Sequence, residues 1–142
     1  MIHFVSISSF RKRLNALLKV KRSVYAGVVT EICSAFKGYT IEQIRQNRDM
    51  ILLNDDAVVI KLRMPDKKQK LSKSDGYRLI YMVMKNLPLV VLLDIYPKRG
   101  PLQQLDIDDN IVTILIQEFM TESKANSLVV HNISQDLTEM EV

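Results

Sequence analysis

Cationic side chains that can bind phosphate are concentrated between residues 61 and 99. This stretch holds ten Lys or Arg residues against three Asp, a net charge of +7, whereas residues 100–142 hold one Lys against eight Asp or Glu, a net charge of −7. A concentrated positive field on a small domain favours a polyanionic partner, most often a nucleic acid. For the lysine-rich stretch 66–73 taken alone, a solvated loop is an equally good interpretation.

Lysine and arginine can together cleave an RNA backbone without a metal ion. RNA carries its own nucleophile, the ribose 2′-hydroxyl, beside the phosphate. Cleavage needs a base for that hydroxyl, positive charge at the phosphate and an acid for the leaving 5′-oxygen. A lysine in a dense cation cluster gives up its proton more readily and can serve as the base, while arginine stays charged and grips phosphate with a planar fork. The sequence shows no suitably placed His or Glu pair for this work.

Three strand-like segments must position these cations, at 57–64, 77–84 and 89–96. All three are rich in aliphatic, β-branched and aromatic residues. Alternation along the first segment places Lys61 and Arg63 on one face, and in the second it places Arg78 on a face with Ile80, Met82 and Met84. The third segment is too apolar for an edge strand and is expected inside the sheet.

Helices are predicted on either side of these strands. A strand at 2–6 precedes apolar residues at helical spacing over 10–18 and 24–36, the second helix capped by Ser23 and ended by Gly38. Thr40 and Gln43 fit a capping box for a short helix over 41–47. Asp106 or Asp108 is expected to cap a last helix. Its predicted buried face consists of Ile111, Ile114, Leu115 and Phe119.

This order of elements predicts an α+β fold, an antiparallel sheet of about four strands with an N-terminal helical hairpin and a C-terminal helix. Residues 1–122 form the predicted domain, and 123–142 form an extension with a polar linker, a short strand at 128–130 and an acidic tail. The single cysteine, Cys33, excludes an internal disulfide and is expected to be a small buried hydrophobe, and no cofactor or metal motif is present. No signal peptide and no apolar run of ~18–20 residues is found, so we expect a cytoplasmic protein without a membrane partner.

Four segments carry a likeness to a known family. They are the first strand running into a helical hairpin with Leu14-Asn15-Ala16-Leu17-Leu18, the strand end Ile60-Lys61-Leu62-Arg63, the segment Ser74-Asp75-Gly76-Tyr77-Arg78-Leu79-Ile80-Tyr81, and Leu93-Asp94-Ile95-Tyr96-Pro97-Lys98-Arg99 before a capped helix. As a set, covering about residues 2–120, they resemble the RelE/ParE/HigB superfamily of bacterial type II toxin–antitoxin toxins. RelE-like members cut mRNA, typically on the ribosome, whereas ParE-like members share the fold and inhibit DNA gyrase, so the fold alone does not settle the activity.

The resemblance implies a role for individual positions. Lys61 matches the strand lysine proposed as the base, Arg78 the arginine that contacts the phosphate, and Arg99 the arginine that assists the leaving group or binds phosphate. Attack by the 2′-hydroxyl would leave a 2′,3′-cyclic phosphate. Further RNA contacts are expected from Arg63, Lys70, Lys73, Tyr96 and Lys98, among which Tyr96 is the candidate to stack on a base. The implied partners are a cognate antitoxin, which would cover or distort the basic site, and mRNA on the ribosome.

Two departures from RelE keep other functions open. Val59 stands where RelE has a second strand lysine, and Leu105 stands where RelE has a tyrosine. The alternatives are a ParE-like gyrase inhibitor, a weakly active relative that mainly binds its antitoxin, and a non-catalytic RNA-binding module of another class. A further hypothesis is that the acidic tail, with Asp136, Glu139 and Glu141, folds back over the basic surface.

Overall fold

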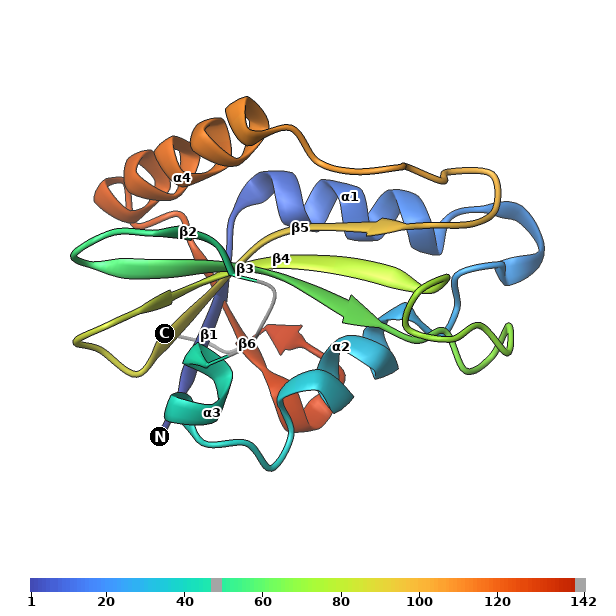
Figure 1. Cartoon of the computed structure of the whole chain (residues 1–142), viewed down its shortest axis with the longest axis horizontal. Helices are drawn as coiled ribbons and strands as arrows, with labels where there is room; N and C mark the ends of the chain where they lie inside the picture. Colours follow the sequence, from blue (N-terminus) through green and yellow to red (C-terminus); the bar gives the residue numbers. More distant parts are fainter. Residues whose placement is uncertain (47–49, 140–142) are drawn as a thin grey trace.

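Seven strands form one sheet and four α-helices cover it in a computed structural model that describes residues 1–46 and 50–139 (Figure 1). The strand order is β2-β3-β4-β5-β1-β6-β7. The strands are β1 (His3–Ser6), β2 (Met50–Leu53), β3 (Ala57–Met64), β4 (Tyr77–Met84), β5 (Leu89–Pro97), β6 (Val129–Asn132) and β7 (Thr138–Glu139). The helices are α1 (Ser8–Leu18), α2 (Val28–Phe36), α3 (Ile41–Arg45) and α4 (Asp109–Lys124). The predicted α+β class is confirmed.

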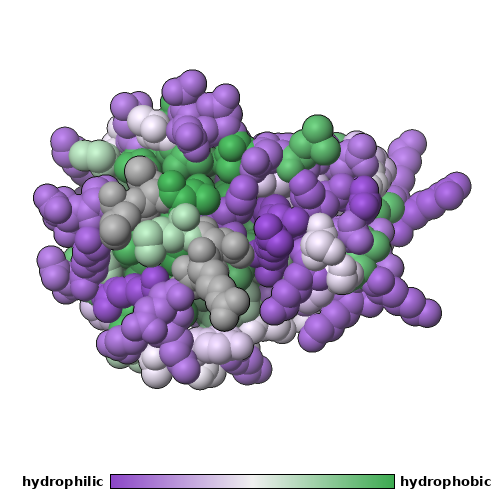
Figure 2. Space-filling model, in the orientation of Figure 1, coloured by the Kyte–Doolittle hydropathy of each residue, from purple (hydrophilic) through white to green (hydrophobic). Residues whose placement is uncertain are grey.

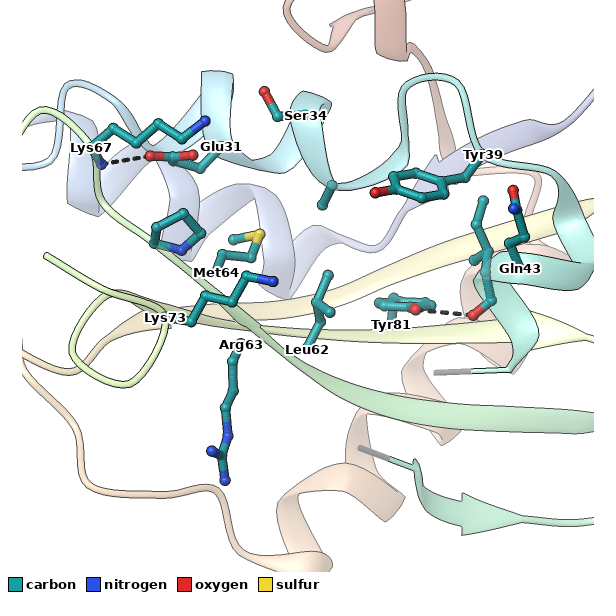
Figure 3. Close-up of a pocket in the computed structure, with 13 residues that line it drawn as sticks. Glu31, Ser34, Tyr39, Gln43, Leu62, Arg63, Met64, Lys67, Lys73 and Tyr81 are labelled. Carbon is teal, nitrogen blue, oxygen red and sulfur yellow. Dashed lines mark hydrogen bonds between the residues drawn. The ribbon is translucent and has the colours of Figure 1, made fainter. Parts of the chain in front are cut away.

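The helices form two layers, with α1 and α4 on one face of the sheet and α2 and α3 on the other (Figure 1). The surface seen in this orientation is mostly hydrophilic, and its largest hydrophobic area lies between α4 and β2 (Figure 2). Phe10 and Leu17 of α1 are fully buried. On the other face, Phe36 of α2 packs edge-on against Tyr81 of β4, with ring centroids 5.1 Å apart. The Tyr81 hydroxyl donates to the Ile44 carbonyl of α3 (Figure 3).

The sheet is wider than the predicted antiparallel sheet of about four strands, and it is mixed. β3, β4 and β5 are antiparallel neighbours as expected, and β5 lies inside the sheet. β1, however, runs parallel to β5, and β2, β6 and β7 add antiparallel pairs. Strands at 2–6 and 128–130 were expected and correspond to β1 and β6, whereas β2 and β7, with four and two residues, carry too little alternation to be recognised. The partner of β1 is set by packing between distant segments, which no local pattern records.

The second helix begins later than its apolar spacing predicts. The expected cap, Ser23, belongs to a short 3₁₀ turn at Lys21–Ser23 and has a positive φ of 52°. α2 begins only at Val28, because Tyr25 turns inward and its ring is 1% exposed in the core. Gly38 ends the helix as predicted, with a φ of +83° that a glycine adopts without strain.

The last helix is capped by Asp108, whose side chain accepts the backbone N–H of Asn110. Its buried face differs from the predicted one. Ile111 and Ile114 are 44% and 55% exposed, whereas Val112, which the prediction omitted, is buried. A period of 3.6 residues shows that a helix has an apolar side. Contacts with other elements decide how the helix is rotated about its axis and therefore which residues are buried.

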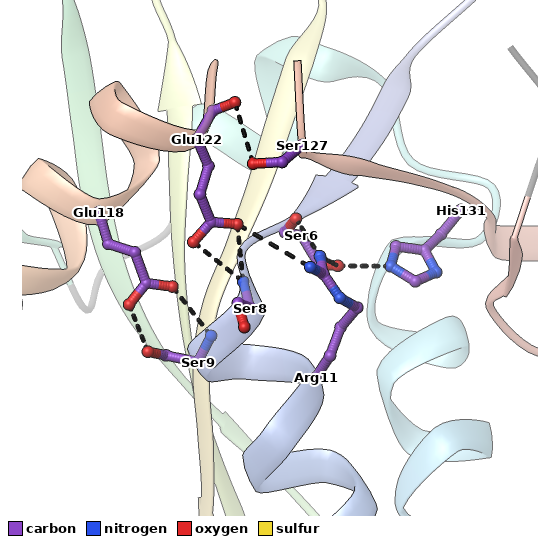
Figure 4. A network of polar contacts seen from close by, with 8 residues as sticks. All are labelled: Ser6, Ser8, Ser9, Arg11, Glu118, Glu122, Ser127 and His131. Carbon is purple, nitrogen blue, oxygen red and sulfur yellow. Dashed lines mark hydrogen bonds and ion pairs between the residues drawn. The ribbon is translucent and has the colours of Figure 1, made fainter. Parts of the chain in front are cut away.

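Two glutamates of α4 supply those contacts. Glu122 accepts the backbone N–H of Ser8 at 2.9 Å, and Glu118 accepts that of Ser9 at 2.9 Å (Figure 4). These N–H groups belong to the first turn of α1, where a helix has no internal partners for its donors and favours negative charge. The two carboxylates therefore cap α1 from α4 and fix which side of α4 faces the sheet.

The chain after residue 122 is part of the same sheet. The predicted linker 121–127 is helical up to Lys124, and β6 then pairs antiparallel with β1. His131 of β6 lies 2.6 Å from the Ser6 hydroxyl of β1, and its other ring nitrogen lies 2.8 Å from the Leu137 carbonyl (Figure 4). β6 and β7 form the edge opposite β2 and β3, so the described part of the tail does not cover the basic strand. Glu141 lies outside the described residues. No helix in the described ranges is long and apolar enough to cross a membrane.

Candidate functional site

The strand register brings four of the eight predicted site residues onto one face of the sheet. Arg63 of β3 lies directly opposite Arg78 of β4, and Arg78 lies opposite Tyr96 of β5. Two residues along, Lys61 lies opposite Ile80, which in turn lies opposite Asp94. Because side chains alternate between faces, Lys61, Arg63 and Arg78 share a face with Asp94 and Tyr96. We call these five residues the cationic face.

The cationic face lies on the side of the sheet that α1 and α4 cover. Arg13 of α1 approaches Asp94, with 3.8 Å between its Nε and the carboxylate, and it also donates to Gln104 at 3.0 Å. Asp94 is only 5% exposed, and this burial raises the pKa of its carboxyl group, an effect that Arg13 opposes. No sequence pattern indicated that Arg13 would reach this face.

Lys61 is bound to a carboxylate from the loop that follows β5. Its Nζ lies 2.8 Å from the Asp106 Oδ1, and the Lys61 side chain is 26% exposed against 66% for Asp106. The hydrogen bond from Lys61 lowers the pKa of Asp106, assisted by the backbone N–H of Ile107. The Asp106 carboxylate is therefore ionised and forms a salt bridge with the Lys61 ammonium group. The sequence suggested Asp106 only as a helix cap.

Arg78 is a buried side chain that binds backbone carbonyls. It is 7% exposed, and its guanidinium donates to the carbonyl oxygens of Lys73 at 2.8 Å, Ser74 at 3.0 Å and Tyr77 at 3.1 Å. A guanidinium has five N–H donors in a fixed fork, so one side chain can hold several carbonyls of a turn. In this structure Arg78 orders the segment that leads into β4.

Arg99 and Lys98 lie where β5 ends, and each is bound within the protein. The Arg99 Nη2 lies 2.6 Å from the Asp75 carboxylate, in a pair that is 62% and 40% exposed. Lys98 donates to the Leu105 carbonyl. The Arg99 backbone carbonyl accepts the Tyr25 hydroxyl at 2.8 Å, and this hydroxyl also accepts the N–H of Leu102 at 3.0 Å. Tyr25 thus fixes the loop that carries Arg99.

Tyr96 cannot stack on a base in this structure. Its ring is fully buried, and burial raises the pKa of its hydroxyl, which lies 3.5 Å from Asp106. The prediction that Tyr96 stacks on a flipped base is therefore not supported by its position. The sequence could not show that the loop before α4 and helix α1 would cover this face of the sheet.

The lysine-rich segment between β3 and β4 is ordered around one buried carboxylate. Asp66 is 1% exposed and accepts the Tyr77 hydroxyl at 2.7 Å and the Gln69 amide at 2.6 Å. Asp66 also forms an isolated bridge with Leu71, which closes a tight turn. Lys67, Lys68, Lys70 and Lys73 are all exposed on this segment. The predicted polar loop is thus an ordered turn that carries four exposed lysine side chains.

A cleft of about 430 Å³ lies on the opposite face, between α2, α3 and β3. Leu62, Met64 and Tyr81 form its apolar floor, Lys67 and Lys73 stand at one end, and Tyr39 and Gln43 stand at the other (Figure 3). Arg63 is at its margin, but the side chain points away from the cleft toward the other face of the sheet (Figure 3). Sequence reasoning missed Tyr39, whose one signal is its place between a helix-ending glycine and a helix cap.

Comparisons with known proteins do not identify a family for this chain. No family model matches it, and neither the curated proteins nor the solved structures searched contain a match. Within the described residues, no group of three or more His, Cys, Asp or Glu is placed to hold a metal ion. The site must therefore be interpreted from its own geometry.

Proposed function

We propose that this protein is the toxin of a type II toxin–antitoxin system and an mRNA endoribonuclease of the RelE type that acts without a metal ion. Two observations support the proposal. The strands that carry the matched segments are neighbours in the sheet, and their cations gather at the end where β3 and β5 end and β4 begins. A cognate antitoxin and ribosome-bound mRNA are the partners that the proposal requires.

The observation that carries the proposal is the register that lines up Lys61, Arg63 and Arg78 on one face of adjacent strands. Strand-borne cations at this spacing are well suited to a phosphodiester backbone, because phosphate binding depends on clustered positive charge. Lys98 and Arg99 extend the positive charge from the end of β5. The face is partly covered, so access to Lys61 depends on the loop that contains Asp106.

The reaction uses the 2′-hydroxyl of the RNA as nucleophile. Its oxygen bonds to phosphorus, the bond from phosphorus to the 5′-oxygen breaks, and the products are a 2′,3′-cyclic phosphate and a 5′-hydroxyl. The phosphate displaces Asp106 from Lys61 and Asp75 from Arg99, so that both cations offset the charge that develops on it. One proton leaves the 2′-hydroxyl and one is delivered to the leaving 5′-oxygen, so the proton count balances, and we assign these two transfers to the pair formed by displaced Asp106 and Lys61. Arg78 acts on the reaction by positioning the loop before β4.

The test is mRNA cleavage in a bacterial translation extract, with the cut sites mapped by primer extension. The wild-type chain should cut the message, and Lys61→Ala and Arg99→Ala should each lower the cleavage rate by about 10²-fold or more, the range for loss of an acid–base or charge-stabilising group. Lys124→Ala, a change at an exposed lysine at the end of α4, is the matched control and should cut normally. Intact message with the wild-type chain would refute the proposed activity.

One observation favours a second candidate, a weakly active relative that mainly binds its antitoxin. The three residues that the resemblance assigns to catalysis are all engaged with protein oxygens, Lys61 with Asp106, Arg99 with Asp75 and Arg78 with carbonyls. Such a protein would bind an acidic antitoxin segment through the same cations and leave the message intact. Growth arrest with intact mRNA and relaxed or damaged DNA would instead indicate the ParE-like gyrase inhibitor.

A further inference from the structure

The cleft between α2, α3 and β3 has the side chains of a nucleotide site. Its floor is apolar and flat, its cations stand at one end, and an aromatic ring stands at the other (Figure 3). Tyr39 is 51% exposed, whereas Tyr25, Tyr77, Tyr81 and Tyr96 are each at most 1% exposed. Tyr39 is therefore the one tyrosine of the chain whose ring is open to a base.

The backbone holds Tyr39 in place from both sides. Gly38, at a φ of +83°, turns the chain sharply out of α2. Thr40 then caps α3, accepting the N–H of Gln43 while its own N–H donates to the Gln43 side chain. A ring mounted between two helix ends loses little freedom on binding, and this makes stacking more favourable. The rim opposite is fixed as well, because Arg78 holds the Lys73 carbonyl and Glu31 accepts the Lys67 N–H at 2.7 Å.

The cleft and the cationic face lie on the two sides of β3. β2 pairs with β3 only at residues 58–60, so within the described residues the edge of β3 from Lys61 to Met64 has no strand beside it. Along this edge, Leu62 and Met64 face the cleft, while Lys61 and Arg63 face the other side. A single strand that crosses the edge can place a base in the cleft and the next phosphates on the cationic face.

We propose that this cleft binds one nucleotide of a single-stranded RNA, with the base stacked on Tyr39 and the phosphate bound by Lys67 and Lys73. The choice of RNA as the ligand rests on the proposed function, whereas the cleft, the exposed ring and the two lysines do not. Stacking on an aromatic ring tolerates any base, so the site would add affinity and direction to the bound strand without reading its sequence.

The experiment measures binding of a fluorescein-labelled 2′-O-methyl oligoribonucleotide, which lacks the nucleophile and cannot be cut, to the purified full chain. Tyr39→Leu should weaken binding between about 5-fold and 100-fold, the usual range for losing one stacked base. Tyr39→Phe, which keeps the ring, should bind like the wild type. Lys73→Ala should lower the slope of log Kd against log salt by about 0.7, the value for one phosphate contact with a single strand.

Lys37→Ala is the charge-matched control, because Lys37 is exposed at the end of α2 and does not line the cleft. Binding by Tyr39→Leu equal to the wild type, or a loss with Lys37→Ala as large as with Lys73→Ala, would overturn the cleft proposal. If Tyr39 controls binding but the translation extract shows intact message, the cleft stands and the proposed cleavage fails. If the message is cut while Tyr39→Leu binds normally, the cleavage stands and the cleft proposal fails.

Discussion

Arg63 and Arg78 occupy paired positions on β3 and β4, yet their surroundings differ. Arg63 is exposed to solvent, whereas Arg78 is buried and donates to three backbone carbonyls. Alternation assigned each to a face of its own strand, and the pairing of the two strands puts them on the same face of the sheet. The exposed Arg63 side chain is therefore accessible to a ligand, whereas the buried Arg78 side chain holds the backbone before β4 in place. A loss of activity on substituting Arg78 alone would therefore not identify it as a catalytic residue.

We predict that Arg78→Ala lowers the free energy of unfolding by roughly 2–4 kcal/mol, because it removes three hydrogen bonds that a buried, charged donor makes to backbone carbonyls. Arg63→Ala should change that free energy by less than about 0.5 kcal/mol, as is usual for an exposed position. Urea denaturation of the two variants and the wild type makes the comparison. Equal stability of Arg78→Ala and the wild type would show that the guanidinium does not support the fold.

A second prediction concerns the carboxylate beside Lys61. Asp106→Asn removes a charge that competes with phosphate, so the affinity for a 2′-O-methyl oligoribonucleotide should rise about two- to fivefold, the equivalent of one surface ion pair. Asp109→Asn, in the first turn of α4, is the control for a general change in charge and should have a smaller effect. Weaker binding by Asp106→Asn would mean that Asp106 helps to hold the RNA rather than competing with it.

At the scale of elements, sequence reasoning succeeded where the signal is local. β3, β4 and β5 were predicted within a residue of their ends, and so was the capping box that begins α3 at Thr40. Sequence reasoning failed where the position or pairing of an element depends on another element with which it packs. The parallel pairing of β1, the strand β2 and the exposed side of α4 all depend on contacts between segments far apart in the chain. The burial of Tyr96 was missed for the same reason, because α1 and the loop before α4, which are distant from β5 or follow it in the chain, cover its side chain.

The entry into β4 provides a test at this scale. A Cβ atom added at Gly76 would lie 2.1 Å from the Met64 carbonyl oxygen, within rigid backbone. We predict that Gly76→Ala destabilises the fold by roughly 2–4 kcal/mol, in the range of overpacked or strained sites. Gly27→Ala is the control, since its added Cβ would meet the flexible Lys68 side chain at 3.2 Å and the Asp66 Oδ1 at an ordinary contact distance of 3.5 Å, and should cost less than about 1 kcal/mol. Similar thermal midpoints for both variants would contradict this prediction.

At the scale of the whole molecule, the basic segments of the chain lie close together. The cations that follow β3 and β5 lie at one end, where the loops after these strands and the turn after α1 come together (Figure 1). Four of the acidic residues after position 100 bind other parts of the protein. Asp106 binds Lys61, Asp108 caps α4, and Glu118 and Glu122 cap α1. The described part of the acidic tail therefore leaves the basic end open to a separate partner.

The most direct test of the central claim is the chemistry of the RNA ends produced in a translation extract. The account predicts that the upstream fragment ends in a 2′,3′-cyclic phosphate or its 3′-phosphate hydrolysis product, that the downstream fragment begins with a 5′-hydroxyl, and that added EDTA does not change these ends once cleavage is initiated. The same ends should be lost with Lys61→Ala and kept with Lys124→Ala. Intact message, or fragments with 3′-hydroxyl and 5′-phosphate ends, would contradict it.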